Sequence, residues 1–187
     1  MDGRSRLEFA DVSALSSETD IGPDNPNGLM VDATRFKRGM RHLASGVSLV
    51  TTAVDGHRFG LVATSVTSVS VDPPSVLCCI NRSAGSFAAI ERSGHFCINV
   101  LGQSLLPLAE RFTLSKSGDE RFEHDNWDVL STGSPALQGA LVNLDCVTAK
   151  TVIFGTHAIF IGEVKAVRVG QSPDKPLIYH DGAYRLG

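Results

Sequence analysis

The stretch Gly60-Leu-Val-Ala-Thr-Ser-Val-Thr-Ser-Val-Ser-Val-Asp-Pro-Pro74 decides the fold of this chain. Its β-branched residues, and the alternation of apolar side chains with short hydroxyl side chains, are typical of a strand with one buried face. The alternation is imperfect near Ser65, where a bulge would fit. Asp72-Pro73-Pro74 should end the strand, because proline has no N–H to donate to a neighbouring strand. The hydroxyl groups would suit a flat ligand, although an ordinary Ser/Thr-rich strand has the same composition.

Further strands are predicted on both sides of this stretch, from apolar and β-branched runs over 46–54, 75–81, 96–100, 140–150, 158–169 and 177–180. Asp55-Gly56-His57 is a hairpin turn signal. Short helices are expected after an Asp32 cap, over 87–92 after a Ser86 cap, and over 104–112. Strands that follow one another with only short helices between them favour an antiparallel barrel or Greek key over a parallel α/β sheet.

Length and composition indicate one soluble globular domain. The chain has 187 residues with 42% hydrophobic and 20% charged residues, enough for a substantial core. Residues 1–31 form an N-terminal extension, either flexible or draped over a partner subunit. The net charge of -3 offers no basic surface for nucleic acid. No run reaches membrane-spanning length and the N-terminus lacks a signal-peptide core, so we expect a cytoplasmic protein.

The cysteines and glycines exclude two common kinds of site. Cys78, Cys79, Cys97 and Cys146 form no Cys-x-x-Cys pair, and three of them lie in apolar runs, which favours buried thiols over metal ligands or disulfides. There is no Gly-x-Gly pair, so neither the dinucleotide fingerprint nor a phosphate-binding Walker loop is present. We therefore expect no metal site, and any nucleotide must bind outside a Rossmann fold.

Two segments have more than one interpretation. The N–H groups at the start of the helix after Ser83-Ala84-Gly85-Ser86, with Arg82 nearby, would make an anion site, but a plain capped helix fits equally well. The segment 113–135, which contains Trp127, has no firm periodicity. It is either a mobile loop that covers a site or a surface excursion.

Seven segments, in this order along the chain, resemble the short-chain flavin reductases. They are Gly46–Thr52, Gly60–Ser70 with its Asp72-Pro73-Pro74 ending, Ser83–Ser86, Ser93–Leu101, Arg111-Phe112, Gly155-Thr156-His157 and Pro176–Tyr179. The similarity covers about residues 33–186. It implies a mainly β fold over 32–187: a split β-barrel of the FMN-binding type, with Greek key connections and short helices, that forms a homodimer.

The resemblance implies an NAD(P)H-dependent flavin reductase, an NADH:flavin oxidoreductase that reduces free FAD or FMN with NADH or NADPH. The reduced flavin would pass to a separate flavin-dependent monooxygenase in a biosynthetic or catabolic pathway. Hydride transfer between the two cofactors needs no general base, which suits a sequence without a triad or paired carboxylates.

The resemblance also implies which residues contact the cofactors. The flavin contacts would be Arg58, Phe59, Gly60, Leu61, Val62, Thr64, Ser65, Cys79, Ile80, Asn81, Gly85, Ser86, Arg111 and Phe112, with Tyr184 at the rim of the pocket. Gly155, Thr156 and His157 would bind the nicotinamide, with His157 as the catalytic residue. Many family members have Gly-Asp-His there, so Thr156 leaves the local charge, and the choice between NADH and NADPH, open.

Three other functions remain open at this point. A flavin-binding electron carrier would share the fold but would not oxidise NADH. A related split-barrel oxidase would act on another substrate, such as a pyridoxamine phosphate. A non-catalytic dimeric module would bind without turnover. Repeated oxidation of NADH in the presence of free flavin separates the reductase from all three.

Overall fold

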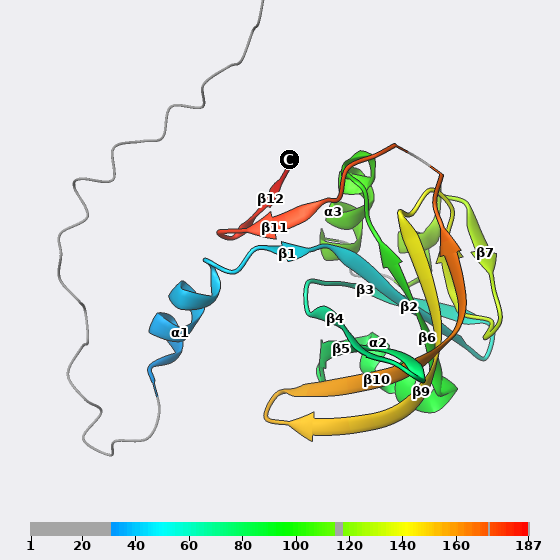
Figure 1. Cartoon of the computed structure of the whole chain (residues 1–187), viewed down its shortest axis with the longest axis horizontal. Coiled ribbons are helices and arrows are strands. Elements are labelled where there is room, and N and C mark those ends of the chain that lie inside the picture. The colour runs from blue at the N-terminus through cyan, green and yellow to red at the C-terminus, as the bar shows by residue number, and fades with distance from the viewer. Residues whose placement is uncertain (1–30, 115–117, 172, 187) are drawn as a thin grey trace, which may run out of the picture. The chain divides into compact units, whose positions relative to one another are not determined.

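The computed structural model describes residues 31–114, 118–171 and 173–186 (Figure 1). The chain divides into two compact units, one that ends at Arg38 and one that begins at Gly39. Helix α1 (Ala33–Met40) begins in the first unit, where Asp32 Oδ2 accepts hydrogen bonds from the N–H groups of Thr34 and Arg35, both at 3.1 Å. The predicted Asp32 cap is confirmed. Residues 1–30 of the expected extension lie outside the described residues.

The second unit is mainly β. Its strands are β1 (Ser45–Gly46), β2 (Ser48–Val54), β3 (His57–Ala63), β4 (Val66–Val71), β5 (Pro74–Asn81), β6 (His95–Val100), β7 (Trp127–Val129), β8 (Pro135–Leu137), β9 (Val142–Phe154), β10 (His157–Val169), β11 (Ile178–His180) and β12 (Ala183–Arg185). Its helices are α2 (Gly85–Ser93) and α3 (Leu106–Leu114), with 3-10 turns at Gln103–Leu105 and Asp119–Phe122. Each run predicted as a strand outside 60–74 contains a strand, with ends that differ by a few residues.

The stretch predicted as one strand is two strands, and that prediction was wrong. The large sheet has the order β3-β2-β6-β9-β10-β5-β4, with all its pairs antiparallel, so β3 and β4 lie at opposite edges. Only Thr64 and Ser65 separate them in the chain, and three Cα steps span at most about 11 Å. The sheet must therefore curl until its two edges meet, which produces a split barrel. The interruption falls at the irregular position near Ser65.

Two tight hairpins fix the register of the barrel. Asp55 and Gly56 join β2 to β3 with φ of 52° and 79°, the left-handed pair that a type I′ turn requires. Gly155 (φ 55°) and Thr156 join β9 to β10, with Phe154 opposite His157. The predicted hairpin at Asp55-Gly56 is confirmed.

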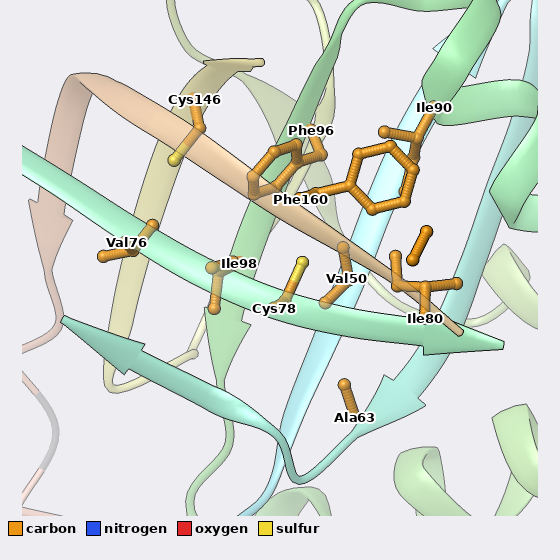
Figure 2. Packing of buried hydrophobic residues seen from close by; sticks show 11 residues of the cluster. Val50, Ala63, Val76, Cys78, Ile80, Ile90, Phe96, Ile98, Cys146 and Phe160 are labelled. Carbon is orange, nitrogen blue, oxygen red and sulfur yellow. The ribbon is translucent and has the colours of Figure 1, made fainter. Parts of the chain in front are cut away.

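The core consists of two clusters on opposite faces of β2 and β3. Figure 2 shows the first cluster, in which Val50, Ile80 and Ile98 lie near the rings of Phe96 and Phe160. The second contains Leu49, Leu101, Leu108, Phe112, Phe122 and Leu137. Neighbouring residues of β2 enter different clusters because side chains alternate across a strand.

Two aromatic residues of the described part of 113–135 belong to the second cluster. Phe122 is only 2% exposed, and its ring centroid lies 5.2 Å from that of Phe112 and 4.8 Å from that of Trp127. Phe122 and Trp127 therefore anchor the segment to the core, while many of its other described residues are exposed. Residues 115–117 lie outside the described residues.

No helix among the described residues is long and apolar enough to cross a membrane. The four cysteines are free thiols, as predicted, and Cys78, Cys97 and Cys146 are buried. Burial raises the pKa of Cys78 and of Cys146 to about 12, and it also raises the pKa of Cys97. These three side chains are unreactive packing groups.

Candidate functional site

The end of β5 and the tip of the β9–β10 hairpin bring two predicted binding segments together. In the antiparallel pairing of β5 with β10, His157 lies opposite Asn81 and Ile159 lies opposite Cys79. The N–H of Arg82 donates to the carbonyl oxygen of Thr156 at 3.0 Å, which ties the hairpin turn to the chain that leaves β5. Residues predicted to bind flavin and residues predicted to bind nicotinamide are therefore neighbours across one pair of strands.

The link between β3 and β4 joins the same place. The Ser65 hydroxyl donates to the carbonyl oxygen of Cys79 at 3.0 Å, and the Cys79 N–H donates to the Ser65 carbonyl oxygen at 3.2 Å. The break that splits the predicted strand thus places Thr64 and Ser65 beside the end of β5. Ile80 points into the first core cluster and supports the strand from behind.

Helix α2 starts directly after this corner. Asn81 Oδ1 accepts hydrogen bonds from the N–H and the hydroxyl of Ser83, both at 2.9 Å, and this turn leads to Ala84 as the N-cap. The prediction that Ser86 caps the helix was wrong: the helix begins at Gly85, and Ser86 lies inside its first turn, 5% exposed.

The uncapped start of α2 fits an anion. The Ala84 side chain has no acceptor, so no side chain caps the helix. The Phe87 N–H donates to the Ala84 carbonyl oxygen at 2.9 Å, and the N–H groups of Gly85 and Ser86 keep their partial positive charge. The exposed Arg82 lies three residues earlier and makes no ion pair with any described residue. Gly85 has open space where a Cβ would stand. These donors match a phosphate group, such as the one that FMN and FAD share.

The assembled corner is an open polar surface. Ser65, Asn81, Gly85, Thr156 and His157 are all exposed, and Thr156 Oγ1 lies 2.9 Å from His157 Nδ1. Hydroxyl, amide and imidazole groups can bind the heteroatoms of a planar ring and orient a second one against it. The described residues hold no group of metal ligands. The corner is suited to positioning two cofactors, and the chemistry would then be theirs.

Several of the other predicted flavin contacts lie at the second core cluster, near α3. Arg58, Gly60 and Val62 share one face of β3, on which the Arg58 guanidinium carbon lies 4.8 Å from the Phe122 ring centroid. Phe112 is 3% exposed and covers Gly60 so closely that a Cβ there would lie 2.7 Å from Phe112 Cε1. Phe59 is half-buried on the same strand, and Leu61 packs against the first cluster.

Arg111 and Tyr184 already have partners inside the protein. Arg111 Nη1 donates to the Glu123 carbonyl oxygen at 2.7 Å and lies 2.5 Å from Asp125 Oδ2. The Tyr184 hydroxyl lies 3.2 Å from Thr113 Oγ1. A flavin role for Arg58, Phe59, Gly60, Leu61, Val62, Arg111, Phe112 and Tyr184 stays a prediction.

Known proteins match this chain over most of its length. The family model "Flavin reductase like domain" matches residues 40–187. This chain belongs to the flavin reductase family. This chain is 39% identical over 155 residues to "FMN reductase (NADH) RutF 1" of Methylorubrum extorquens, and the match covers 83% of this chain and 77% of that protein.

Two solved structures share the fold of this flavin reductase. Nitrilotriacetate monooxygenase component B from Mycobacterium thermoresistibile superposes with a TM-score of 0.76 at 31% identity, covering 81% of this chain and 84% of that one. The NADH:FAD oxidoreductase SgcE6 from Streptomyces globisporus C-1027 superposes with a TM-score of 0.77 at 27% identity, covering 84% of this chain and 96% of that one. The predicted family and the mainly β, split-barrel fold are confirmed.

Proposed function

We propose that this flavin reductase oxidises NADH, passes the hydride to FMN or FAD, and releases the reduced flavin to a separate monooxygenase. Its place among NADH:flavin oxidoreductases rests on family membership and on relatives named FMN reductase (NADH). A monooxygenase partner is supported by the name of the Mycobacterium thermoresistibile protein. Because the proposed reaction draws on NADH, we infer a cytoplasmic location.

The observation that carries the proposal is the corner at Asn81. There the exposed residues Ser65, Asn81 and His157 meet the start of α2, and the half-buried Cys79 holds Ser65 against β5. The uncapped N–H groups of α2, with Arg82, would hold the flavin phosphate. The Asn81 amide NH₂, which donates to no described residue, would donate to the polar edge of the ring system, and His157 would orient the nicotinamide beside it. When bound, the flavin accepts the hydride at its own ring.

FMN and FAD share the ring, the ribityl chain and the first phosphate, and the corner offers groups for these parts. We therefore infer that the site recognises the FMN half of either cofactor. This interpretation is consistent with relatives named for FMN and for FAD. The exposed corner surrounds the ligand on few sides, which suits a protein that must release its product.

A second copy of the chain would cover this open surface, and we propose a homodimer. The long β9–β10 hairpin extends from the barrel in Figure 1, and the last three residues of β9 expose apolar side chains at its tip: Val152 (37%), Ile153 (46%) and Phe154 (82%). Apolar exposure on this scale is typical of an interface. Sedimentation analysis of the intact chain should give twice the 19.9 kDa monomer mass, and Phe154→Glu should shift it toward monomer. A wild-type monomer would refute the dimer.

Turnover in solution tests the function. A catalytic amount of the intact protein is mixed with excess NADH and either FMN or FAD, and NADH consumption and the reduced flavin that passes an ultrafiltration membrane are both measured. When oxygen is excluded, we expect each chain to consume many equivalents of NADH, and we expect reduced flavin to appear in the filtrate. Flavin that stays bound to the protein without NADH consumption would instead indicate an electron carrier or a non-catalytic module.

A further inference from the structure

A cavity of about 590 Å³ lies on the far face of β2 and β3 from the first core cluster. Ala53, Arg58, Trp127, Val129, Gly133 and Pro135 are among its lining residues. None of the lining residues comes from 64–65, 79–86 or 155–157, so the cavity is separate from the corner at Asn81. Its volume lies within the range of small-molecule sites, roughly 300–1,000 Å³.

Buried hydrogen bonds hold the walls of this cavity in place. The fully buried Asp145 carboxylate accepts from the N–H groups of Ser131 and Thr132, both at 2.7 Å, at the base of the loop that carries Gly133. The Thr51 hydroxyl donates to the carbonyl oxygen of Pro135 at 2.5 Å. The cavity is preformed, and a ligand would not have to order this loop on binding.

The charged groups around the cavity leave one cation without a partner among the described residues. Arg168 lies 2.5 Å from Asp128 and also donates to Asn143 and to two carbonyl oxygens, so both members of that ion pair are satisfied. Arg58 makes no ion pair and no hydrogen bond through its guanidinium with any described residue, and its guanidinium carbon lies 4.8 Å from the Phe122 ring centroid. The lining therefore presents one available positive charge among apolar walls.

We propose that this cavity binds a small aromatic monocarboxylate. One guanidinium matches one carboxylate, since its planar fork can donate two parallel hydrogen bonds to the two oxygens. Trp127, Val129 and Pro135 supply apolar surface for an aromatic ring. The flavin corner does not require such a site, and this proposal gives Arg58 a different ligand from the flavin that the family resemblance implies for it.

The chain carries its own reporter for this ligand. Trp127 is the single tryptophan and lines the cavity, so the intrinsic tryptophan fluorescence of the intact protein comes from this place alone. Titration with phenylacetate should change that fluorescence saturably, with a dissociation constant below about 1 mM. Neutral phenylacetamide, which has the same shape without the charge, should bind about tenfold more weakly or worse.

Two substitutions in the cavity lining test whether the positive charge of Arg58 binds the ligand, and a third substitution elsewhere is the control. Arg58→Gln should weaken phenylacetate binding about tenfold, whereas Arg185→Gln, which removes an exposed charge elsewhere, should leave it unchanged. Val129→Glu should abolish binding by placing a negative charge on the wall, and Val129 is exposed enough (64%) for the fold to tolerate it. Far-ultraviolet circular dichroism verifies that each variant is folded.

Several results would overturn the proposal. No saturable change up to about 10 mM phenylacetate would exclude the site, and equal affinity for the acid and the amide would exclude recognition of the charge. Unchanged affinity in both Arg58→Gln and Val129→Glu would place the ligand elsewhere. In equilibrium dialysis, labelled phenylacetate should bind equally well with and without saturating FMN. Full displacement of phenylacetate by FMN would show that the two ligands share one site, and the proposal of a separate site would be wrong.

Discussion

Asn81 and Asn99 lie on the same sheet and use the same side chain in opposite ways. Asn99 is fully buried: its Nδ2 donates to the Leu49 carbonyl oxygen and to Thr51 Oγ1, both at 3.0 Å, while its Oδ1 accepts from the Leu137 N–H and from Asn143. Asn81 is exposed, and only its Oδ1 has partners, both from Ser83. Its amide NH₂ donates to no described residue.

The difference distinguishes structural from binding polar groups. Around Asn99 and Asp145, donors and acceptors are paired inside the protein, so their loss should affect folding. At the corner around Asn81, donors face outward beside an uncapped helix, so their loss should affect ligands. Substitutions around Asn99 and Asp145 should lower the free energy of unfolding. Substitutions around Asn81 should leave it nearly unchanged and should affect ligand binding instead.

Asp145→Ala should have the largest effect on stability. It removes the acceptor for Ser131, Thr132 N–H and the Thr132 hydroxyl, and leaves these donors unsatisfied near the core. We expect the free energy of unfolding to fall by about 3–5 kcal/mol in urea denaturation. Asn81→Ala, the matched change at the corner, should alter it by less than about 0.5 kcal/mol. Similar losses in the two variants would break the comparison.

Gly60→Ala tests the packing of β3 against α3. A Cβ at this position would lie 2.7 Å from Phe112 Cε1 and 3.2 Å from Thr51 Cγ2, so the buried aromatic cluster must shift. We expect a loss of about 1–3 kcal/mol in the same denaturation experiment. Gly46→Ala is the control, because nothing lies within 4 Å of its added Cβ. If Gly60→Ala lowers the free energy of unfolding no more than the control does, the aromatic cluster around Phe112 can shift without cost.

His157→Ala should leave stability unchanged and affect only the nicotinamide. His157 is exposed and pairs opposite Asn81 at the corner. The apparent Michaelis constant for NADH should rise roughly tenfold, a typical value for one lost polar contact, while the dissociation constant for FMN stays the same. Steady-state kinetics and flavin titration measure the two constants. An unchanged constant for NADH would remove His157 from the site.

His95 provides the smallest effect, which depends on pH. Burial lowers its pKa below the ordinary 6.5, against the opposing effect of Asp145, and its Nδ1 lies 2.7 Å from the Ser134 hydroxyl. Just below pH 6.5, the His95 imidazole therefore takes up a proton in the unfolded chain but stays neutral in the folded chain. Stability should fall as the pH drops through this window, by at most about 1.4 kcal/mol per pH unit from this group.

The matched variants for this effect are His95→Gln and His42→Gln. His95→Gln should flatten the pH dependence of unfolding below pH 6.5, whereas His42→Gln, at an exposed position, should keep the wild-type slope. If the two slopes change equally, His95 is not the group responsible.

Local sequence patterns predicted most of the helices and strands because neighbouring residues set the conformation of these segments. The Asp55-Gly56 turn and the β-branched runs carry their conformational preference in neighbouring residues. The division of 60–71 into β3 and β4 is tertiary, because it depends on two different partner strands. Ser86 failed as a cap because the turn from Asn81 to Ser83 sets the start of α2 earlier than a cap at Ser86 would.

The site was predicted in part for the same reason. Family motifs identified Ser65, Asn81, Gly85 and His157, and strand pairing brings these residues to one corner. Phe112 matches the family motif equally well but lies buried over Gly60, which no sequence pattern reveals. The cavity beside Arg58 combines segments from residue 53 to residue 168, so only the fold assembles it.

Amide chemical shifts measured during an FMN titration would show whether the flavin binds at the corner around Asn81. With the intact, isotope-labelled protein, the largest changes should occur at Ser65, Asn81, Gly85 and Ser86, while the amides of Ser131 and Thr132 above Asp145 stay in place. If the largest changes instead surround Arg58 and Trp127, with the Asn81 corner unmoved, the flavin binds on the other side of β3 and the account is wrong.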